Sequence, residues 1–281
     1  MEGKFNMESR QKKESVLMSG LVYFAAFITF GMLLFIIGYI LVKGIPHLSL
    51  DFFSWEYNSE NVSVVPSIIN TIIMAVITLI IVVPVGIGAA IYTVEYAKRG
   101  SKVVKVVRIT TETLQGIPSI VYGLFGLLFF VNAMKWGQSM LAGACTLAIM
   151  VLPVIMRTAE EALQSVPDLY REASFGLGAG RLRTVFRIVL PPAVPGILSG
   201  VILAIGRIVG ETAALIYTSG TVAKLPGSLM QSGRTISLHM WMLANEGLHE
   251  DKAYATAVLL LILVIGINYL SHVLAGKLAA K

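Results

Sequence analysis

The segment EASFGLGAGRLRTVFRIVLP occupies residues 172–191 and lies between two long apolar stretches of the chain. It carries Arg181, Arg183 and Arg187 but only one acidic residue, Glu172. Short basic connections between apolar segments are typical of the cytoplasmic side of membrane proteins, where Lys and Arg accumulate. The segment therefore indicates that the polypeptide crosses a lipid bilayer on both sides of it.

The composition agrees with a membrane protein. Of the 281 residues, 56% are hydrophobic and 14% are charged, whereas a soluble domain carries about 25% charged residues. The net charge is +6, but the basic residues form short runs between apolar segments, which argues against a nucleic-acid partner. The single cysteine, Cys145, has no disulfide partner, and no Cys or His pair has ligand spacing, so we expect no metal site and no cofactor.

Six apolar segments are long enough to span a bilayer, which takes roughly 20 residues. They cover residues 16–42, 68–96, 114–134, 139–156, 194–219 and 253–274. With the N-terminus inside, 16 Lys and Arg residues fall in the inside segments and five in the outside segments. This asymmetry predicts that residues 1–15 and 276–281 are cytoplasmic tails. The sequence thus predicts an all-α membrane protein with about six transmembrane helices.

Two predicted outside loops are long and contain aromatic residues. Residues 43–66 include Phe52, Phe53, Trp55 and Tyr57, and residues 220–252 include Trp241. Aromatic side chains of this kind form a belt at the membrane interface in many membrane proteins, and they could instead form a landing surface for an external partner. The apolar patch at 236–243 predicts a short helix within the second loop.

The predicted cytoplasmic loop contains two helix-start signals. Thr158, followed three residues later by Glu161, has the pattern of a capping box and predicts a helix that begins there. Ser165 and Asp168 repeat the spacing and predict a second start. We expect a short helix over about residues 167–177 to follow this second signal.

Glycine and proline residues mark the ends of the helices in this loop. Gly178 and Gly180 should terminate the short helix, and a second helical piece over 181–189 should end at Pro191-Pro192. The apolar residues of the short helix lie three or four apart, so they share one face. Such an amphipathic helix could lie on the bilayer or dock in the groove of another protein.

The spacing within the loop resembles the EAA loop of permease subunits of binding-protein-dependent ABC importers. That pattern is matched by Glu172, Ala173, Ser174, Gly178, Ile188, Leu190 and Pro191. The one departure is Ser174, which replaces the second alanine of the pattern. The resemblance implies that Glu172, Ala173, Ser174 and Gly178 belong to a coupling helix that contacts the ATP-binding subunit.

The same resemblance implies a domain organisation. Residues 67–275 would form the MetI-like core of a type I ABC importer permease, with a coupling loop at 158–191. Residues 16–42 would be an additional first transmembrane helix, and residues 43–66 an external loop. The chain would not be an enzyme itself, because it has no phosphate-binding Gly-x-x-x-x-Gly-Lys-Ser/Thr motif, and ATP hydrolysis would occur on a partner chain.

The fifth apolar segment contains two charged residues, Arg207 and Glu211. A charge in the middle of a membrane costs about 3–17 kcal/mol, so both residues require a protein or water environment. On a continuous helix they share a face with the small residues Gly196, Gly200, Ala204, Ala214 and Thr218. They could form a structural pair four residues apart, or Arg207 could line the transport path and bind an anion through its guanidinium fork.

Two further motifs resemble phosphate-importer permeases of the PstA family. One is Arg207-x-x-Gly210-Glu211-Thr212-Ala213-Ala214, and the other is Gln115-Gly116-Ile117-Pro118-Ser119 with Gly123. The resemblance implies that Arg207, Glu211 and Thr212 lie on the path of inorganic phosphate. It also implies a PstC-like second permease, a PstB-like ATPase dimer and a PstS-like external phosphate-binding protein, in the inner membrane. From the residues alone, Gly116, Pro118 and Gly123 predict a kinked helix entrance.

Other functions remain open at this point. A permease for another oxyanion, such as sulfate or molybdate, would differ only in the residues of the path. A secondary transporter would need no exposed coupling loop and would be expected to show inverted repeats. An intramembrane enzyme would need paired catalytic residues within the spans, whereas the spans contain a single charged pair.

Overall fold

A computed structural model describes residues 2–98 and 100–279, which form helices and connecting loops with no strand among them. The elements in chain order are α1 (Glu2–Gly44), η1 (Ile45–His47), η2 (Leu50–Phe53), α2 (Val65–Ile91), η3 (Tyr92–Tyr96), α3 (Lys102–Gln115), α4 (Ser119–Gly126), η4 (Leu127–Ala133), α5 (Met140–Gln164), α6 (Asp168–Gly176), α7 (Arg181–Thr184), η5 (Val185–Val189), α8 (Leu190–Gly210), α9 (Ala213–Thr218), α10 (Ile236–Glu246) and α11 (Glu250–Ala279). The segments η1 and η2 are 3-10 helices, whereas η3, η4 and η5 are π-helical.

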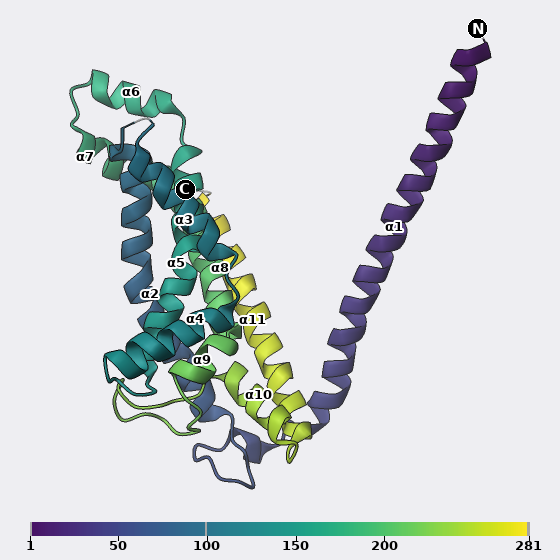
Figure 1. Cartoon of the computed structure of the whole chain (residues 1–281), viewed down its shortest axis with the longest axis vertical. Helices are drawn as coiled ribbons and strands as arrows, with labels where there is room; N and C mark the ends of the chain where they lie inside the picture. Colours follow the sequence, from purple (N-terminus) through teal and green to yellow (C-terminus); the bar gives the residue numbers. More distant parts are fainter. Residues whose placement is uncertain (1, 99, 280–281) are drawn as a thin grey trace.

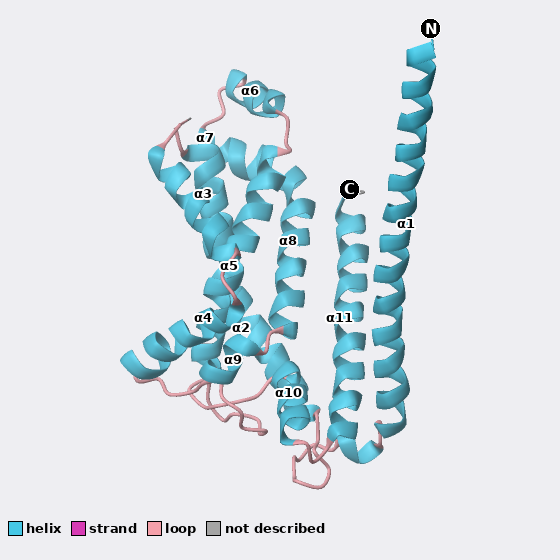
Figure 2. Cartoon of the chain, turned by 45° about the vertical axis from the view of Figure 1, so that its right-hand side comes forward, coloured by secondary structure: helices cyan, strands magenta, loops and turns pink. Residues whose placement is uncertain are grey.

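Five of the helical segments are long and apolar enough to cross a membrane, or six if the bent pair α3 and α4–η4 counts as one span. The prediction of an all-α membrane protein with about six spans is therefore confirmed. The long helices run side by side, with α6 and α7 at one end and α10 and the longest loops at the other (Figure 1). The start of α1 and the end of α11 point toward the end that carries α6 (Figure 2).

Helix α5 lies at the centre of the bundle. Its buried side chains pack with those of α2 and α8, and Leu147, Met150 and Ile155 are almost completely buried. Close contact depends on glycines on the neighbouring helices: a Cβ at Gly196 would lie 2.7 Å from Cβ of Ala162, and one at Gly200 would overlap Thr158. The predicted small-residue face of the fifth apolar segment is thus confirmed as a helix-packing face over residues 196–204.

Helix α1 stands apart from the bundle along most of its length (Figure 1). The C-terminal end of α1 meets the start of α11, where a Cβ on Gly44 would overlap the carbonyl oxygen of Tyr254. The part of α1 that is apolar enough to span a membrane begins at Ser15. The predicted N-terminal tail before it belongs to the same continuous helix. Residues 1, 280 and 281 of the predicted tails lie outside the described residues.

The third predicted span, residues 114–134, is kinked near Pro118 as predicted, but the kink is a complete break in the helix. Helix α3 ends at Gln115, and the next helix begins at Ser119 after a bend of 103°. Pro118 explains the break, because proline disfavours helical dihedrals in the residue before it and has no N–H to donate. The segment 102–115, which the sequence placed largely in a connecting loop, is a separate amphipathic helix.

Two further boundaries differ from the predictions. Thr158 does not begin a helix: it lies inside α5, and its hydroxyl donates to the backbone carbonyl oxygens of Val154 and Ile155. Helix α5 continues to Gln164 instead of ending near Met156. Pro191-Pro192 does not end the preceding helix, because these residues occupy the first turn of α8, where a missing N–H costs no hydrogen bond.

The predicted outside loops are folded against the bundle. The short helix expected at 236–243 is present as α10. Phe52 is buried in a cluster with Val64 and Ala255, while Trp55 is 70% exposed. The aromatic residues of this region therefore do not all serve as an interfacial belt or a landing surface, since Phe52 is part of the protein core.

Candidate functional site

The loop that resembles a coupling helix is an exposed structure at one end of the bundle. The predicted helix at 167–177 is present as α6, within one residue at each end. Gly178 follows it with a φ of +81°, a conformation in which glycine avoids the strain that other residues meet. The turn directs the chain into α7 and exposes Glu172, Ala173 and Gly178 to solvent.

Several apolar side chains of α6 and its C-cap are exposed. Leu169 is 73% exposed and Leu177 is 90% exposed, and Tyr170 and Phe175 are also exposed. A groove of about 410 Å³ is lined by residues of α6, α7 and η5, among them Ser174 and Arg183. Large apolar side chains that are exposed together on a short element are typical of an interaction site.

Ser174, the departure from the EAA pattern, is buried rather than exposed. Its hydroxyl lies 2.8 Å from the hydroxyl of Thr184 on α7, which also donates to the carbonyl oxygen of Gly180. The serine therefore adds one hydrogen bond between α6 and α7. This contact explains why a small polar residue fits where the pattern has alanine.

We expect Ser174→Ala to retain most transport. Thr184 keeps its bond to Gly180, so the change removes one hydrogen bond with a net value of about 0.5–1.5 kcal/mol and leaves no charge unpaired. Uptake in reconstituted vesicles should stay within a few-fold of the unaltered protein. Ser174→Leu is the matched contrast, because it adds volume at a buried position, and equal uptake by both variants would contradict the assigned packing.

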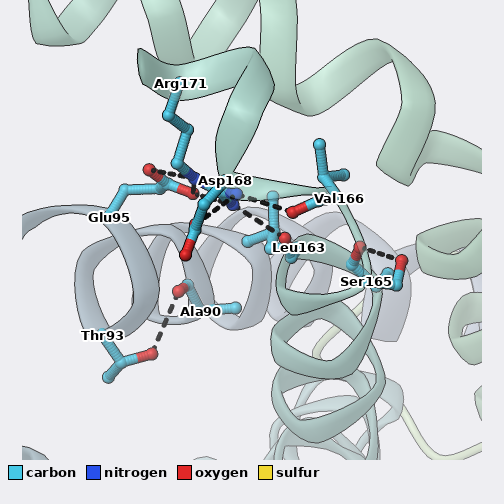
Figure 3. A network of polar contacts seen from close by, with 9 residues as sticks. Ala90, Thr93, Glu95, Leu163, Ser165, Val166, Asp168 and Arg171 are labelled. Atoms are coloured by element: carbon cyan, nitrogen blue, oxygen red, sulfur yellow. Dashed lines mark hydrogen bonds and ion pairs between the residues drawn. The ribbon is translucent and has the colours of Figure 1, made fainter.

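A single arginine joins α6 to the two long helices beneath it (Figure 3). Arg171 places Nη2 2.7 Å from Oε1 of Glu95 and donates from Nη1 to the carbonyl oxygen of Val166 at 2.7 Å and from Nη2 to that of Leu163 at 2.9 Å. The side chains of Arg171 and Glu95 are 13% and 8% exposed. The short helix α6 is thus fixed both to η3, at the end of α2, and to the end of α5.

Sequence patterns do not predict this contact. Arg171 is one of the basic residues of the predicted inside loop, and Glu95 lies at the edge of the predicted span 68–96. The two residues are 76 positions apart, so no local spacing rule connects them. The one available signal was a carboxylate within the apolar run 68–96, which needs a partner when it is buried.

A second polar group lies next to the first. Glu160 of α5 is buried, accepts a hydrogen bond from the Thr93 hydroxyl, and lies 3.6 Å from Nε of Arg108 on α3. A cavity of about 170 Å³ at this place is lined mainly by charged and polar residues, including Arg108 and Glu112. The ends of α2, α3 and α5 nearest to α6 are therefore held together by polar contacts rather than by apolar packing alone.

The second candidate region is a break in the fifth predicted span, at Glu211 and Thr212. Helix α8 ends at Gly210, and Glu211 has extended dihedrals of φ −75° and ψ 130°. Its carboxylate accepts a hydrogen bond from the N–H of Ala214 at 3.1 Å, so it caps the start of α9, and its carbonyl oxygen accepts one from the Ser237 hydroxyl. The predicted continuous helix 194–219 is therefore wrong beyond Gly210.

The break also separates the two charges of the predicted pair. Among the ion pairs of the described residues, none joins Arg207 to Glu211, so the structural pair that their spacing allowed as one alternative is not formed. Arg207 is half-buried on α8, while Glu211 is 9% exposed. The face shared by Gly196, Gly200 and Arg207 does not extend to Glu211.

The two short motifs that the sequence singled out pack against each other. A Cβ at Gly123 of α4 would lie 2.9 Å from Cα of Ala214 and 3.1 Å from the carbonyl oxygen of Ala213, so only glycine allows this crossing with α9. The hydroxyl of Tyr122 donates to the carbonyl oxygen of Leu114 at 2.7 Å, across the break between α3 and α4. Two broken spans thus meet at the crossing of α4 and α9.

These features define a class of protein. A bundle of membrane helices, two of them interrupted at the same place, carries an exposed apolar helix at one end for a separate partner. This is the architecture of a transporter subunit that is driven from outside its own chain. The chain belongs to the family of binding-protein-dependent transport system inner membrane components, whose sequence pattern matches residues 82–281.

Relatives and solved structures support this assignment. The chain is 34% identical to a probable ABC transporter permease protein, YqgI, of Bacillus subtilis over 84% of this chain and 85% of that protein. It is 32% identical to the phosphate transport system permease protein PstA of Yersinia pestis over 96% and 95% of the two chains. The fold is similar to a chain of the MetNI methionine ABC transporter, with a TM-score of 0.61 and 21% identity over 76% of this chain and 93% of that one.

Proposed function

We propose that this chain is a permease subunit that forms, with a second permease, the membrane path for import of inorganic phosphate. The observation that carries the proposal is the packing of Gly123, in the first motif, against Ala213 and Ala214, which end the second motif, at a point where two spans are broken. Broken spans expose backbone and polar groups within the bilayer, where a hydrophilic substrate needs them. The relatives named for phosphate transport give the substrate class.

Arg207 is the residue proposed to contact phosphate. A guanidinium group offers paired donors that match two oxygens of a tetrahedral anion. Glu211 is occupied in capping α9, so it does not neutralise Arg207 in this conformation. Thr212 is the N-cap residue of α9 and is half-buried, so it lies at the same break.

The driving force would come from a dimer of ATP-binding subunits that binds the exposed face of α6. The apolar side chains of this face and the groove beside them support the docking role of Glu172, Ala173 and Gly178. ATP binding and hydrolysis would move α6, and the movement would open the path alternately to the two sides of the membrane. An external phosphate-binding protein would deliver the anion to the opposite end.

The decisive experiment is uptake by the reconstituted importer. The chain should be co-expressed with its second permease and ATP-binding subunit, purified as a complex and placed in vesicles with the binding protein outside. ATP-dependent accumulation of labelled phosphate, without accumulation of sulfate or molybdate, is the expected result. Accumulation of either competing oxyanion in place of phosphate would overturn the substrate while leaving the permease assignment intact.

Topology is a separate prediction. The distribution of basic residues predicts that α6 and both ends of the chain are cytoplasmic, so the loop between η2 and α2 should be external. In a variant with Cys145→Ser, a Ser59→Cys change should react with a membrane-impermeant thiol reagent in intact cells. Gly176→Cys, on α6, is the control and should react only after permeabilisation. The reverse pattern of labelling would contradict the orientation.

A further inference from the structure

The unpaired polar atoms of the buried interior are concentrated at one place. Among the described residues, the buried side-chain nitrogen and oxygen atoms without a hydrogen-bond partner belong to Ser67, Asn70, Arg234 and His239. These residues come from the first two turns of α2, the segment before α10, and α10 itself. Buried polar groups are normally hydrogen-bonded, so a cluster of exceptions requires an explanation.

Contacts place Arg234 beside Asn70 and Tyr57, and His239 on the same tyrosine ring. The side-chain amide of Asn70 donates to the carbonyl oxygen of Arg234 at 3.2 Å. The ring of Tyr57 lies 4.9 Å from the guanidinium carbon of Arg234 and, edge to face, 6.2 Å from the ring of His239. Ser67 lies one turn before Thr71 on α2, and the Thr71 hydroxyl accepts from the N–H of Ile236.

The charge at this point is positive and uncompensated. Arg234 is 3% exposed, its Nε and Nη2 have no partner, and none of the ion pairs of the described residues includes it. Burial and the neighbouring charge of Arg234 lower the pKa of His239 to about 3, so the imidazole is neutral at pH 7. The positive end of the α2 dipole lies at the same end of the helix as Ser67. An unpaired buried cation is costly unless an anion accompanies it.

We propose that Arg234 binds a small inorganic anion between α2 and α10. The free donors are Nε and Nη2 of its guanidinium, which suit an anion. Arg234 is 3% exposed, so a carboxylate on a partner protein cannot reach it without unfolding this region. Chloride and phosphate share the negative charge and the acceptor chemistry that these donors require.

The site is distinct from the transport path but linked to it. The Ser237 hydroxyl, three residues beyond Arg234, donates to the carbonyl oxygen of Glu211 at the break between α8 and α9. A resident anion would therefore hold the start of α10 in place and, through Ser237, the cap of α9. The proposal concerns this structural anion and does not depend on which substrate the chain transports.

Thermal unfolding of the intact importer complex tests the proposal. The complex is exchanged into gluconate buffer and titrated with chloride or with phosphate at constant ionic strength, while the unfolding midpoint is recorded. At about five times its dissociation constant, the bound anion should raise the midpoint by about 2–4 °C. A response to chloride and phosphate alike indicates a general anion site, and a response to phosphate alone indicates an oxyanion site.

Variants separate this site from Arg207. The anion response should persist in an Arg207→Gln variant and in the control Lys224→Gln, which removes an exposed cation of the same loop. It should disappear in Arg234→Gln. A response that disappears with Arg207→Gln and remains with Arg234→Gln would assign the anion to the transport path and overturn the proposal.

A direct measurement covers the case in which Arg234→Gln does not fold. Crystals of the unaltered complex grown with bromide should show an anomalous peak within hydrogen-bond distance of Nε or Nη2 of Arg234. The absence of such a peak, together with a midpoint that does not change with chloride or phosphate, would mean that only water occupies the site and would refute the proposal.

Discussion

Arg171→Glu should abolish coupled transport while the complex still assembles. The change places a carboxylate beside Glu95 and opposite the carbonyl oxygens of Leu163 and Val166, so every contact that joins α6 to η3 and α5 becomes repulsive. Removing one partner of a buried pair costs about 3–5 kcal/mol. This cost lowers the fraction of molecules in which α6 is fixed to η3 and α5 by about a hundredfold or more. Phosphate uptake should fall by a similar factor, and ATP hydrolysis should no longer depend on the binding protein.

The pair Arg157–Glu161 offers a matched control. It has the same chemistry, but its side chains are 55% and 64% exposed, and exposed pairs contribute about 0–1 kcal/mol. Arg157→Glu should therefore transport almost normally. The double variant with both Arg171→Glu and Glu95→Arg should recover part of the uptake. It restores the charge pair but lacks the two hydrogen bonds to the backbone carbonyl oxygens. Normal coupling in the single variant Arg171→Glu would show that α6 moves the bundle by another route.

Arg207→Lys should lose phosphate uptake although the positive charge is kept. An ammonium group cannot present two parallel donors to the oxygens of one anion, and its compact charge is more strongly hydrated than a guanidinium. Charge-assisted contacts of this kind are worth about 1.5–3 kcal/mol, so uptake should fall about 10- to 100-fold. Arg207→Gln, which also removes the charge, should fall further.

Assembly must be measured alongside uptake. Both Arg207 variants should co-purify with the second permease and the ATP-binding subunit and retain basal ATP hydrolysis, because Arg207 forms no ion pair among the described residues. Arg157→Lys, at an exposed position, is the control for the same substitution and should have no effect. Full uptake by Arg207→Lys would exclude a bidentate contact with the substrate and leave only a general electrostatic role.

Hydropathy predicts the helices that consist of one long apolar run of residues. Helices α5, α8 and α11 begin within a few residues of the predicted segments, and α6 was found from its cap signals and from Gly178. The break at Glu211 was missed because the apolar run continues through it. Its signals were nevertheless local: Gly210 can end a helix, and Glu211 and Thr212 can cap the next one.

Other features could not be found by local rules. Pro118 predicted a kink, but the bend of 103° depends on α4 crossing α9 at Gly123, a contact between segments about ninety residues apart in the printed sequence. Arg171 and Glu95 are likewise distant in sequence. Arg234 fell in a predicted external loop, where a buried charge is not expected, because the folding of that loop against α2 is a tertiary event.

The isolation of α1 has a consequence for the evolutionary history of this chain. Its described contacts with the bundle are concentrated near Gly44 and the start of α11, and the side chains of residues 15–36 are largely exposed. Substitutions along most of the helix would therefore escape selection for fit against the bundle and would be filtered mainly for apolar character and length. Residues 44, 254 and 258 should change in concert, whereas the remainder of α1 should accumulate replacements faster than α5 does.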